Sequence, residues 1–422
     1  MSDDCLTPLG TDNLAPINAY KRKDYLQHPV GRLQLFGSLC ATVFLVNLAR
    51  IVYAPLLQPV AADFGVTAAS LGVIATAAWL GSALPRMPTG YILTFVPRHY
   101  VVIATGTLLV FTSAFTGLAM SVEHLLVGAF FMGLSSGMYF IAANPLLSEL
   151  FPQRIGRILG IHGMSSQIAA VSAPLIVGGI LLFTDNWRMT FFIISATAAI
   201  TTSFIVYASR RVDLPHAGSE DRSLLVAARA QWPLILTGII IAGTIGFLWN
   251  GLFNLYGDYL EVVKGIDEDT GRLLLSGMFA AGIPAWLISG QMADRWPNIP
   301  VLAFILFLFS GAVIGLTVVD GFLAVAALSL IAGYGFFAMI PVLDTYLLAS
   351  LPDRHRGSAY TWYSATMMIF TALGSGVIGT AVSSGVPYDV AFQVPAVAVA
   401  ITGIGLFLAY RLGVLQAVST RR

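Results

Sequence analysis

Long hydrophobic stretches alternate with short polar ones along almost the whole chain. Because an α-helix rises about 1.5 Å per residue, about 20 apolar residues are enough to cross the hydrocarbon core of a bilayer. The pattern predicts an all-α membrane protein with twelve transmembrane helices. They are expected at residues 33–60, 68–95, 100–121, 124–150, 157–183, 188–208, 233–260, 270–293, 299–319, 322–349, 358–383 and 389–411.

One polar stretch interrupts this pattern midway. Residues 209–231 carry several charges together with Pro215 and Gly218, a composition typical of a connecting segment. It predicts a linker between two six-helix bundles. The expected organisation is an N-terminal tail (1–32), a first bundle (33–208), a linker (209–232), a second bundle (233–411) and a C-terminal tail (412–422).

Composition agrees with a chain that uses lipid as its solvent. Of the 422 residues, 57% are hydrophobic and only 10% are charged, whereas soluble proteins carry about 25% charged residues. This excludes a disordered or nucleic-acid-binding chain, since both need high charge. The two cysteines, Cys5 and Cys40, provide neither a disulfide framework nor a thiolate metal site. We therefore expect no cofactor and no nucleic acid partner.

The basic residues predict an orientation, because loops that cross the membrane are depleted in Lys and Arg. With a cytoplasmic N-terminus, only Arg188, Lys264 and Arg272 lie outside, and Arg50 and Arg86 lie within spans. The remaining seventeen of the 22 lie inside: Lys21, Arg22, Lys23, Arg32, Arg98, Arg154, Arg157, Arg210, Arg211, Arg222, Arg229, Arg295, Arg354, Arg356, Arg411, Arg421 and Arg422. The first 31 residues lack a signal-peptide pattern. We expect a multi-pass protein of the cell (cytoplasmic) membrane with tails and linker in the cytoplasm.

The two predicted bundles share an internal repeat with an offset of 200 residues. Gly65-Val66-Thr67 recurs as Gly265-Ile266-Asp267, in each case a turn followed by a residue that can cap the next helix. The same offset relates Gly90 to Gly290, Pro97 to Pro297, Gly133 to Gly333, Pro152 to Pro352 and Arg154 to Arg354. Parallel halves of this kind place a substrate site between them near the bilayer midplane.

The loop after the second helix of each half carries a recognisable motif. Residues 290–295 read Gly-Gln-Met-Ala-Asp-Arg, whereas the first half keeps only Gly90 and Arg98 of the pattern and has Thr94 and Phe95 in place of the charged pair. The second-half sequence resembles the Gly-x-x-x-Asp-Arg loop of the major facilitator superfamily. The resemblance covers residues 33–412 and implies two pseudo-symmetric six-helix bundles.

The resemblance also implies a cytoplasmic gate. A carboxylate near the N-terminus of another helix gains about 0.3–1 kcal/mol from the helix dipole, enough to favour one state of a rocking transporter. The alternative is that Asp294 and Arg295 simply mark the membrane boundary. The predicted gate residues are Gly90, Arg98, Gly290, Asp294, Arg295 and Arg354.

Two arginines lie within predicted spans, where an ionised side chain costs ~2.5–3.5 kcal/mol. Arg50 lies on helix 1, which lines the central cavity in this superfamily, and Arg86 lies on helix 2. A guanidinium has five donors that suit a carboxylate or phosphate. Arg50 could instead bond backbone carbonyls, and Arg86 could extend toward the cytoplasm. We predict both as substrate-binding residues.

Asp344 is the acid that lies well inside the second half, on helix 10, and its counterpart in the first half is Asn144. A carboxyl group in a low-dielectric cavity can load and release a proton during transport. A purely structural hydrogen bond would produce the same burial. We predict Asp344 as a proton-coupling residue, with H⁺ as the coupling ion.

Four further polar or aromatic residues lie on helices that border the cavity in this superfamily. One sequence does not show which way each of them faces, and tyrosine and tryptophan also anchor span ends at the membrane interface. The additional predicted substrate-binding residues are Tyr53, Asn254, Tyr256 and Trp362.

Signatures of two branches of the superfamily are incomplete. Antiporters carry a glycine-rich motif on helix 5 and drug antiporters an arginine on helix 4, but here Ala169 and Ala173 replace two of those glycines and Ala129 the arginine. Nitrate porters place an arginine four residues before the Gly90 position, as Arg86 does, but their second arginine corresponds to Trp286. These departures weigh against both a standard drug exporter and a nitrate porter.

The motifs of soluble enzymes do not apply here. Residues 133–137 match Gly-x-Ser-x-Gly, but they lie inside a predicted helix with no strand before it, so small residues that allow close helix packing explain them better. We predict no enzymatic activity. The expected function is secondary transport of a small organic anion by alternating access, with the functional unit a monomer. A multidrug or metabolite efflux antiporter is the alternative, and a membrane-embedded enzyme or receptor the alternative from another class.

Overall fold

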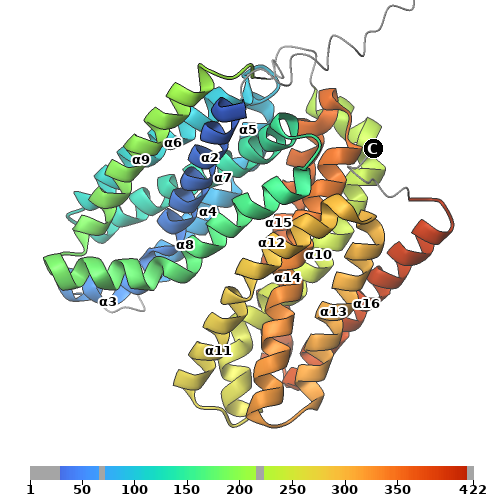
Figure 1. Ribbon diagram of the computed structural model, residues 1–422. Helices are drawn as coiled ribbons and strands as arrows, with labels where there is room; N and C mark the ends of the chain where they lie inside the picture. The colour runs from blue at the N-terminus through green and yellow to red at the C-terminus, as the bar shows by residue number, and fades with distance from the viewer. Residues whose placement is uncertain (1–28, 66–71, 215–222, 416–422) are drawn as a thin grey trace, which may run out of the picture.

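The computed structural model describes residues 29–65, 72–214 and 223–415, and every element in them is a helix. Two bundles lie side by side (Figure 1). The first contains α2 (Pro29–Ile51), α3 (Tyr53–Phe64), α4 (Gly72–Ala83), α5 (Arg86–Ile92), α6 (Arg98–Gly117), α7 (Val122–Leu150), α8 (Ile155–Thr184) and α9 (Arg188–Ser209). The second contains α10 (Leu224–Val262), α11 (Glu268–Ala280), α12 (Gly282–Arg295), α13 (Asn298–Val318), α14 (Phe322–Ser350), α15 (Asp353–Ser383) and α16 (Tyr388–Arg411).

Eleven helices of the described chain are long and apolar enough to cross a membrane. The predicted span at 68–95 is the twelfth; residues 68–71 lie outside the described residues, and the part from residue 72 contains the two shorter helices α4 and α5. Proline explains the break, because it has no N–H for the i−4 hydrogen bond and its ring collides with that carbonyl. Pro85 precedes α5 and Pro88 lies inside it.

The same cause breaks two other predicted spans. The span at 33–60 is interrupted at Val52, between α2 and α3, and Pro55 removes the hydrogen bond that would reach back to Ile51. The span at 270–293 breaks at Ala281, between α11 and α12, and Pro284 lies in the first turn of α12. Helix 2 of each bundle is therefore interrupted, at positions that differ by about one turn under the 200-residue offset.

Helix α10 begins earlier than its predicted span. Its first residue, Leu224, lies within the predicted linker, and the side chain of Ser223 caps it by accepting a hydrogen bond from the Val226 N–H. A kink at Gln231, where the backbone leaves helical geometry, separates this first segment from the apolar remainder. Pro233 follows the kink and accounts for it.

The internal repeat is visible in the packing of each bundle. A Cβ at Gly133 would lie 2.0 Å from the carbonyl oxygen of Ala78, and a Cβ at Gly333 would lie 2.2 Å from that of Met278. All four positions are related by the same 200-residue offset. The close approach also explains the Gly-x-Ser-x-Gly sequence, since Gly137 has the same kind of contact with the Ser82 carbonyl oxygen.

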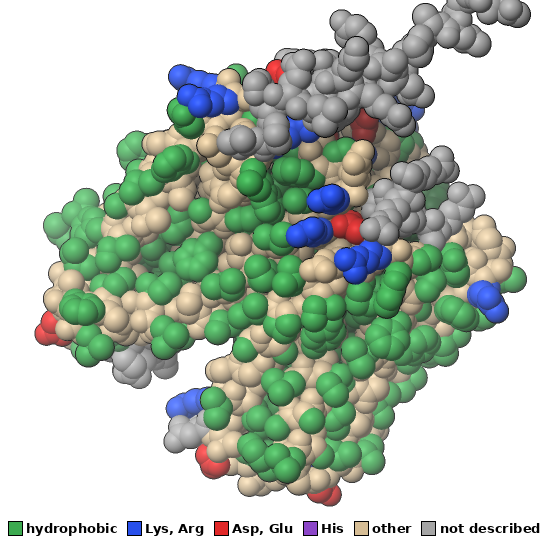
Figure 2. Space-filling model, in the orientation of Figure 1, with side chains coloured by type: hydrophobic (Ala, Val, Ile, Leu, Met, Phe, Trp, Pro, Cys, Tyr) green, Lys and Arg blue, Asp and Glu red, His purple; other side chains and the backbone are tan. Residues whose placement is uncertain are grey.

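The bundles contact each other at the end where Arg98, Arg154, Arg295 and Arg354 lie, which we call the basic end. Helix α8 packs there against α12, and α5 against α15. Toward the other end, which we call the open end, the space-filling view shows a cleft between the bundles (Figure 2). The molecule is therefore closed on one side and accessible from the other.

Within each bundle, ionic contacts fasten the loops at the open end. In the first bundle Asp63 accepts from the Arg188 guanidinium at 2.7 Å and from the Trp187 indole N–H at 3.2 Å. In the second, the Lys264 ammonium lies 3.3 Å from Asp320. Each of these contacts joins residues of the same bundle, so none of them connects the two bundles across the cleft.

Candidate functional site

Two charged side chains from opposite bundles are buried near the contact between them. Arg86 lies at the start of α5 and has 7% of its surface exposed. Asp344 lies six residues before the end of α14 and has 3% of its surface exposed. Helix α15 links them, because Ser364 accepts a hydrogen bond from Arg86 and Tyr360, one turn earlier, donates one to Asp344. The interrupted helix of the first bundle and the proline-containing helix of the second thus deliver opposite charges to one region.

Asp344 is held by groups from both bundles. The amide of Asn144 on α7 donates to Asp344 Oδ2 at 3.3 Å and to the Tyr360 hydroxyl at 2.9 Å. The Tyr360 hydroxyl on α15 donates to the same carboxylate oxygen at 3.0 Å. Asn144 and Asp344 are separated by 200 residues. Because symmetry-related residues touch each other, this contact lies on the axis that relates the two bundles.

Arg86 forms hydrogen bonds with both bundles, and its bonded partners are neutral. Its Nη1 donates to the Ser364 hydroxyl on α15, and its Nε donates to the Ser82 carbonyl oxygen at 3.3 Å. Neither partner neutralises the guanidinium. A buried cation without a directly bonded acid is a group that an incoming anion can pair with.

Arg50 lies beside Arg86, where α2 ends. Its Nη2 donates to Asn47 Oδ1 at 2.6 Å, its Nη1 lies 3.5 Å from the Ser82 hydroxyl, and its guanidinium lies 4.2 Å from the ring centre of Trp79. Nε is buried and has no hydrogen-bond partner in the described part of the chain. Both arginines therefore contact Ser82, and both bond neutral groups. We call Arg50, Arg86, Asp344, Asn144 and Tyr360 the polar cluster.

At the basic end, Asp294 joins the two bundles. Its two carboxylate oxygens accept hydrogen bonds from the backbone N–H groups of Gly156 and Arg157, each at 2.8 Å. These are the first unpaired donors of α8, so the carboxylate interacts with the positive end of the helix dipole. A Cβ at Gly290 would lie 2.4 Å from the Gly156 carbonyl oxygen. Two of the predicted gate residues, Gly290 and Asp294, thus lie in the α8–α12 contact.

The corresponding contact of the first half is built differently. Thr94, which replaces the aspartate, donates to the Tyr91 carbonyl oxygen within its own bundle. Arg98 forms a buried ion pair with Glu149, and a Cβ at Gly357 would lie 3.0 Å from its guanidinium. The helix dipole contact therefore occurs on one side of the interface, and a buried ion pair lies near the other.

The three remaining gate predictions have different outcomes. Gly90 packs closely against Thr361, whose side-chain Cγ2 would lie 2.3 Å from a Cβ at that glycine. This contact is part of the α5–α15 interface. Arg295 and Arg354 are exposed at the basic end and take no part in the contacts described above.

A family model described as Major Facilitator Superfamily matches residues 39–267 and 259–417 of the chain. The chain belongs to the major facilitator superfamily. It is therefore a secondary transporter and a multi-pass membrane protein, and it belongs to a family of transporters rather than of enzymes. The sequence-based predictions of family, fold class and lack of enzymatic activity are confirmed.

The alignments with two relatives cover most of the chain. An uncharacterized MFS-type transporter of Bacillus subtilis, YwfA, is 26% identical over 400 residues, which cover 89% of this chain and 91% of the relative. A probable nitrate transporter of Staphylococcus aureus strain MRSA252, NarT, is 26% identical over 310 residues, covering 70% of this chain and 76% of the relative.

Solved structures agree on the superfamily fold. The transporter FucP in the outward conformation has a TM-score of 0.69 at 15% identity, covering 90% of this chain and 99% of that one. The proton:xylose symporter XylE bound to 6-bromo-6-deoxy-D-glucose has a TM-score of 0.71 at 13% identity, covering 89% and 95%. At these identities the likeness shows the fold alone.

Two tyrosines predicted to bind substrate lie inside their own bundles in this superfamily member. Tyr53 is buried and donates its hydroxyl to the Met132 sulfur at 3.1 Å. Tyr256 is buried and shares a hydrogen bond with the Ser329 hydroxyl. The structure does not bring either tyrosine to the polar cluster.

The other two predicted lining residues also lie elsewhere. The Trp362 indole N–H donates to the Leu224 carbonyl oxygen at 3.1 Å, which fastens the first segment of α10 to α15. Asn254 is exposed and donates to the Asn250 carbonyl oxygen at 2.8 Å, one turn earlier in α10. Neither contacts the arginines or the aspartate.

Several residues of the polar cluster and its surroundings were missed by sequence reasoning. Ser82, Ser364 and Tyr360 are ordinary helix residues whose importance depends on which face meets the other bundle. Asn47 precedes Arg50 by three residues, a spacing that places both on one helix face. That spacing is the signal in the sequence that could have found Asn47.

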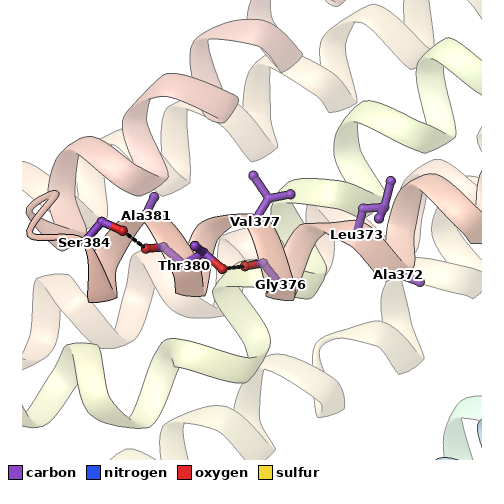
Figure 3. A pocket seen from close by; sticks show the side chains of 7 residues that line it. All are labelled: Ala372, Leu373, Gly376, Val377, Thr380, Ala381 and Ser384. Atoms are coloured by element: carbon purple, nitrogen blue, oxygen red, sulfur yellow. Dashed lines mark hydrogen bonds between the residues drawn. The ribbon is translucent and has the colours of Figure 1, made fainter.

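A separate shallow groove lies along the C-terminal half of α15 (Figure 3). It has a volume of about 490 Å³ and is lined by Ala372, Leu373, Gly376, Val377, Thr380, Ala381 and Ser384. All of these lie on α15 or, in the case of Ser384, at its C-cap, and none carries a charge. The groove has no chemistry to recognise a solute, and the polar cluster is the candidate substrate site.

Proposed function

We propose that the protein moves an organic anion across the cytoplasmic membrane by alternating access. The observation that supports this most directly is the pair of arginines that both contact Ser82 between the bundles and both hydrogen-bond neutral groups. Two neighbouring cations with one acid nearby leave an excess of positive charge. An anion that reaches them from the cleft supplies the missing partner and gains charge-assisted hydrogen bonds.

Coupling to protons belongs to the same proposal. Asp344 is hydrogen-bonded by one group from each bundle, so its charge influences the contact between them. It also interacts with Arg86, the residue proposed to bind the anion. A proton on Asp344 would remove the internal competitor for the guanidinium. Anion and proton would then bind together, as expected for a symporter.

The basic end is proposed to face the cytoplasm, in accordance with the distribution of Lys and Arg. The cleft then opens to the outside. In this state an external solute reaches the polar cluster, while the α8–α12 and α5–α15 contacts block the way inward. We propose that the monomer is sufficient, since both bundles that form the site belong to one chain.

Nitrate is a second candidate because a relative carries the name probable nitrate transporter. Against it, the position expected for the second arginine of nitrate porters is occupied by Trp286, whose ring packs against Gly163 in the α8–α12 contact. Drug efflux is disfavoured for a different reason. Lipophilic cations, which many exporters carry, would be repelled by two neighbouring guanidinium groups.

Uptake into proteoliposomes tests the anion site. Arg50→Gln and Arg86→Gln each remove a positive charge and are expected to lower uptake of labelled acetate, phenylacetate or nitrate, whichever the wild type transports, by at least about tenfold. Arg354→Gln is the matched control, because that arginine is exposed at the basic end. Undiminished uptake in both cavity variants would refute the assignment. Selective transport of nitrate would replace the organic anion by the second candidate.

A further inference from the structure

An aromatic cluster in the second bundle has no part in the function described so far. It consists of Trp249 and Phe253 on α10, Phe279 on α11, and Phe336 and Phe337 on α14. The rings of Trp249 and Phe336 are stacked, with centroids 4.3 Å apart and an angle of 5° between the planes. Phe337 lies edge-on to Trp249 at 5.4 Å. Rings that stack on each other in this way also offer a flat surface to a third ring.

The aromatic cluster lies next to the contact between the bundles. Gln167 on α8 of the first bundle donates its amide to the Phe279 carbonyl oxygen at 2.7 Å. A Cβ at Gly282 would lie 2.7 Å from the Phe337 ring and 3.0 Å from the Gln167 side chain. Residues of both bundles therefore meet at the edge of this cluster.

The same turn of α8 also reaches the arginines. Asn47, which accepts a hydrogen bond from Arg50, donates its amide to the Ser166 carbonyl oxygen at 2.6 Å. Ser166 and Gln167 are adjacent in sequence. Neighbouring residues of α8 thus contact the support of Arg50 and the aromatic cluster.

Part of the aromatic surface is accessible. Phe336 is half-buried, and Trp79, on which the Arg50 guanidinium rests, has 48% of its surface exposed. An indole covered by a guanidinium and a stacked pair of rings both favour a flat partner. An inorganic anion would bind the arginines alone, and the exposed ring surfaces of Trp79 and Phe336 would stay in contact with water.

We infer that the transported anion is amphipathic, with a carboxylate or similar oxyanion held by Arg50 and Arg86 and a flat aromatic body placed against Phe336, which Trp249 supports from behind. This inference rests on the proposed function and specifies the substrate class. The arginines select the charge, and the aromatic cluster selects the body. Small carboxylates would bind to the same arginines more weakly.

Binding of phenylacetate and acetate to the purified protein, measured by titration calorimetry in detergent, tests this. We expect phenylacetate to bind at least about tenfold more tightly than acetate, because only phenylacetate adds a ring. Phe336→Leu should reduce this ratio to near one and leave the affinity for acetate unchanged. Phe336→Tyr, which keeps the ring, should preserve the ratio. Phe304→Leu is the matched control, because Phe304 is exposed on α13.

The outcomes separate the two proposals. If Arg50→Gln weakens both ligands but phenylacetate binds no better than acetate to the wild type, the aromatic site is wrong and the anion site stands. If Phe336→Leu folds, as judged by its melting temperature, and keeps the full ratio, the aromatic site is also wrong. If acetate binds the wild type but phenylacetate does not at millimolar concentration, the aromatic site alone is wrong. If neither Arg50→Gln nor Arg86→Gln changes either affinity, both proposals fail.

Discussion

At the scale of single residues, the polar cluster depends on neutral groups that hold charged ones. Asp344 has bonds to an amide and a hydroxyl, and the arginines have bonds to serines and an asparagine. A directly bonded acid would neutralise the arginines and leave little attraction for a ligand. Neutral partners position the guanidinium groups and keep their charge available.

Asp344→Asn tests the coupling role at this scale. The amide keeps the size and part of the hydrogen bonding of the carboxyl group but cannot carry a proton. In proteoliposomes we expect accumulation of the anion driven by an inward proton gradient to fall at least about tenfold, while exchange between internal and external anion persists. Gradient-driven accumulation equal to that of the wild type would contradict the role. Asp353→Asn is the control, since that carboxylate is exposed.

Residue type predicted part of the site well. Arg50, Arg86 and Asp344 could be selected from the sequence because charge inside a membrane is costly, and the structure places them in one region. The rotation of a helix about its axis is not encoded by residue type. Tyr53 and Tyr256 therefore looked like lining residues, although their rings point into their own bundles.

At the scale of helices, glycine determines how closely the bundles approach. Gly290 and Gly156 face each other, so that the backbones of α12 and α8 touch, and Asp294 lies one turn beyond Gly290. The sequence motif predicted a carboxylate beside a helix N-terminus. It did not show which helix, because the pairing of α12 with α8 depends on the arrangement of the whole bundle.

Gly290→Val is expected to prevent closure at the basic end. Its Cβ would lie 2.4 Å from the Gly156 carbonyl oxygen and 2.9 Å from the Gly160 Cα, and backbone atoms cannot move aside as a side chain can. We expect transport to fall at least about tenfold and maleimide labelling of Thr361→Cys, a buried position at that end, to become faster. The control is Gly311→Val on α13, where a Cβ meets nothing within 4 Å. Unchanged labelling would show that the contact does not control closure.

Proline explains why helix boundaries were harder to predict than helix existence. Each of the twelve predicted spans corresponds to helical structure, yet three of them are divided at or near a proline. Hydrophobicity detects a span but is insensitive to a change of direction within it. The break before Arg86 matters for function, since it positions the arginine at the start of a new helix facing α15.

At the scale of the whole molecule, the two bundles are joined at the basic end and separate at the other (Figure 2). The ionic contacts at the open end fasten loops within each bundle, so each can move as a unit. Rocking about the polar cluster, where Asn144 meets its symmetry counterpart Asp344, would close the open end and separate α8 from α12. Such rocking is the simplest motion that exposes the site to each side in turn.

Which side each end faces is open to direct measurement. Asp320 at the open end and Asp353 at the basic end have side chains that are 91% and 86% exposed. In a background with Cys5 and Cys40 replaced by serine, Asp320→Cys should react with a membrane-impermeant maleimide in intact cells. Asp353→Cys should react only after the membrane is permeabilised. The reverse pattern would place the basic end outside, and the cleft described here would then receive its solute from the cytoplasm, which favours export over uptake.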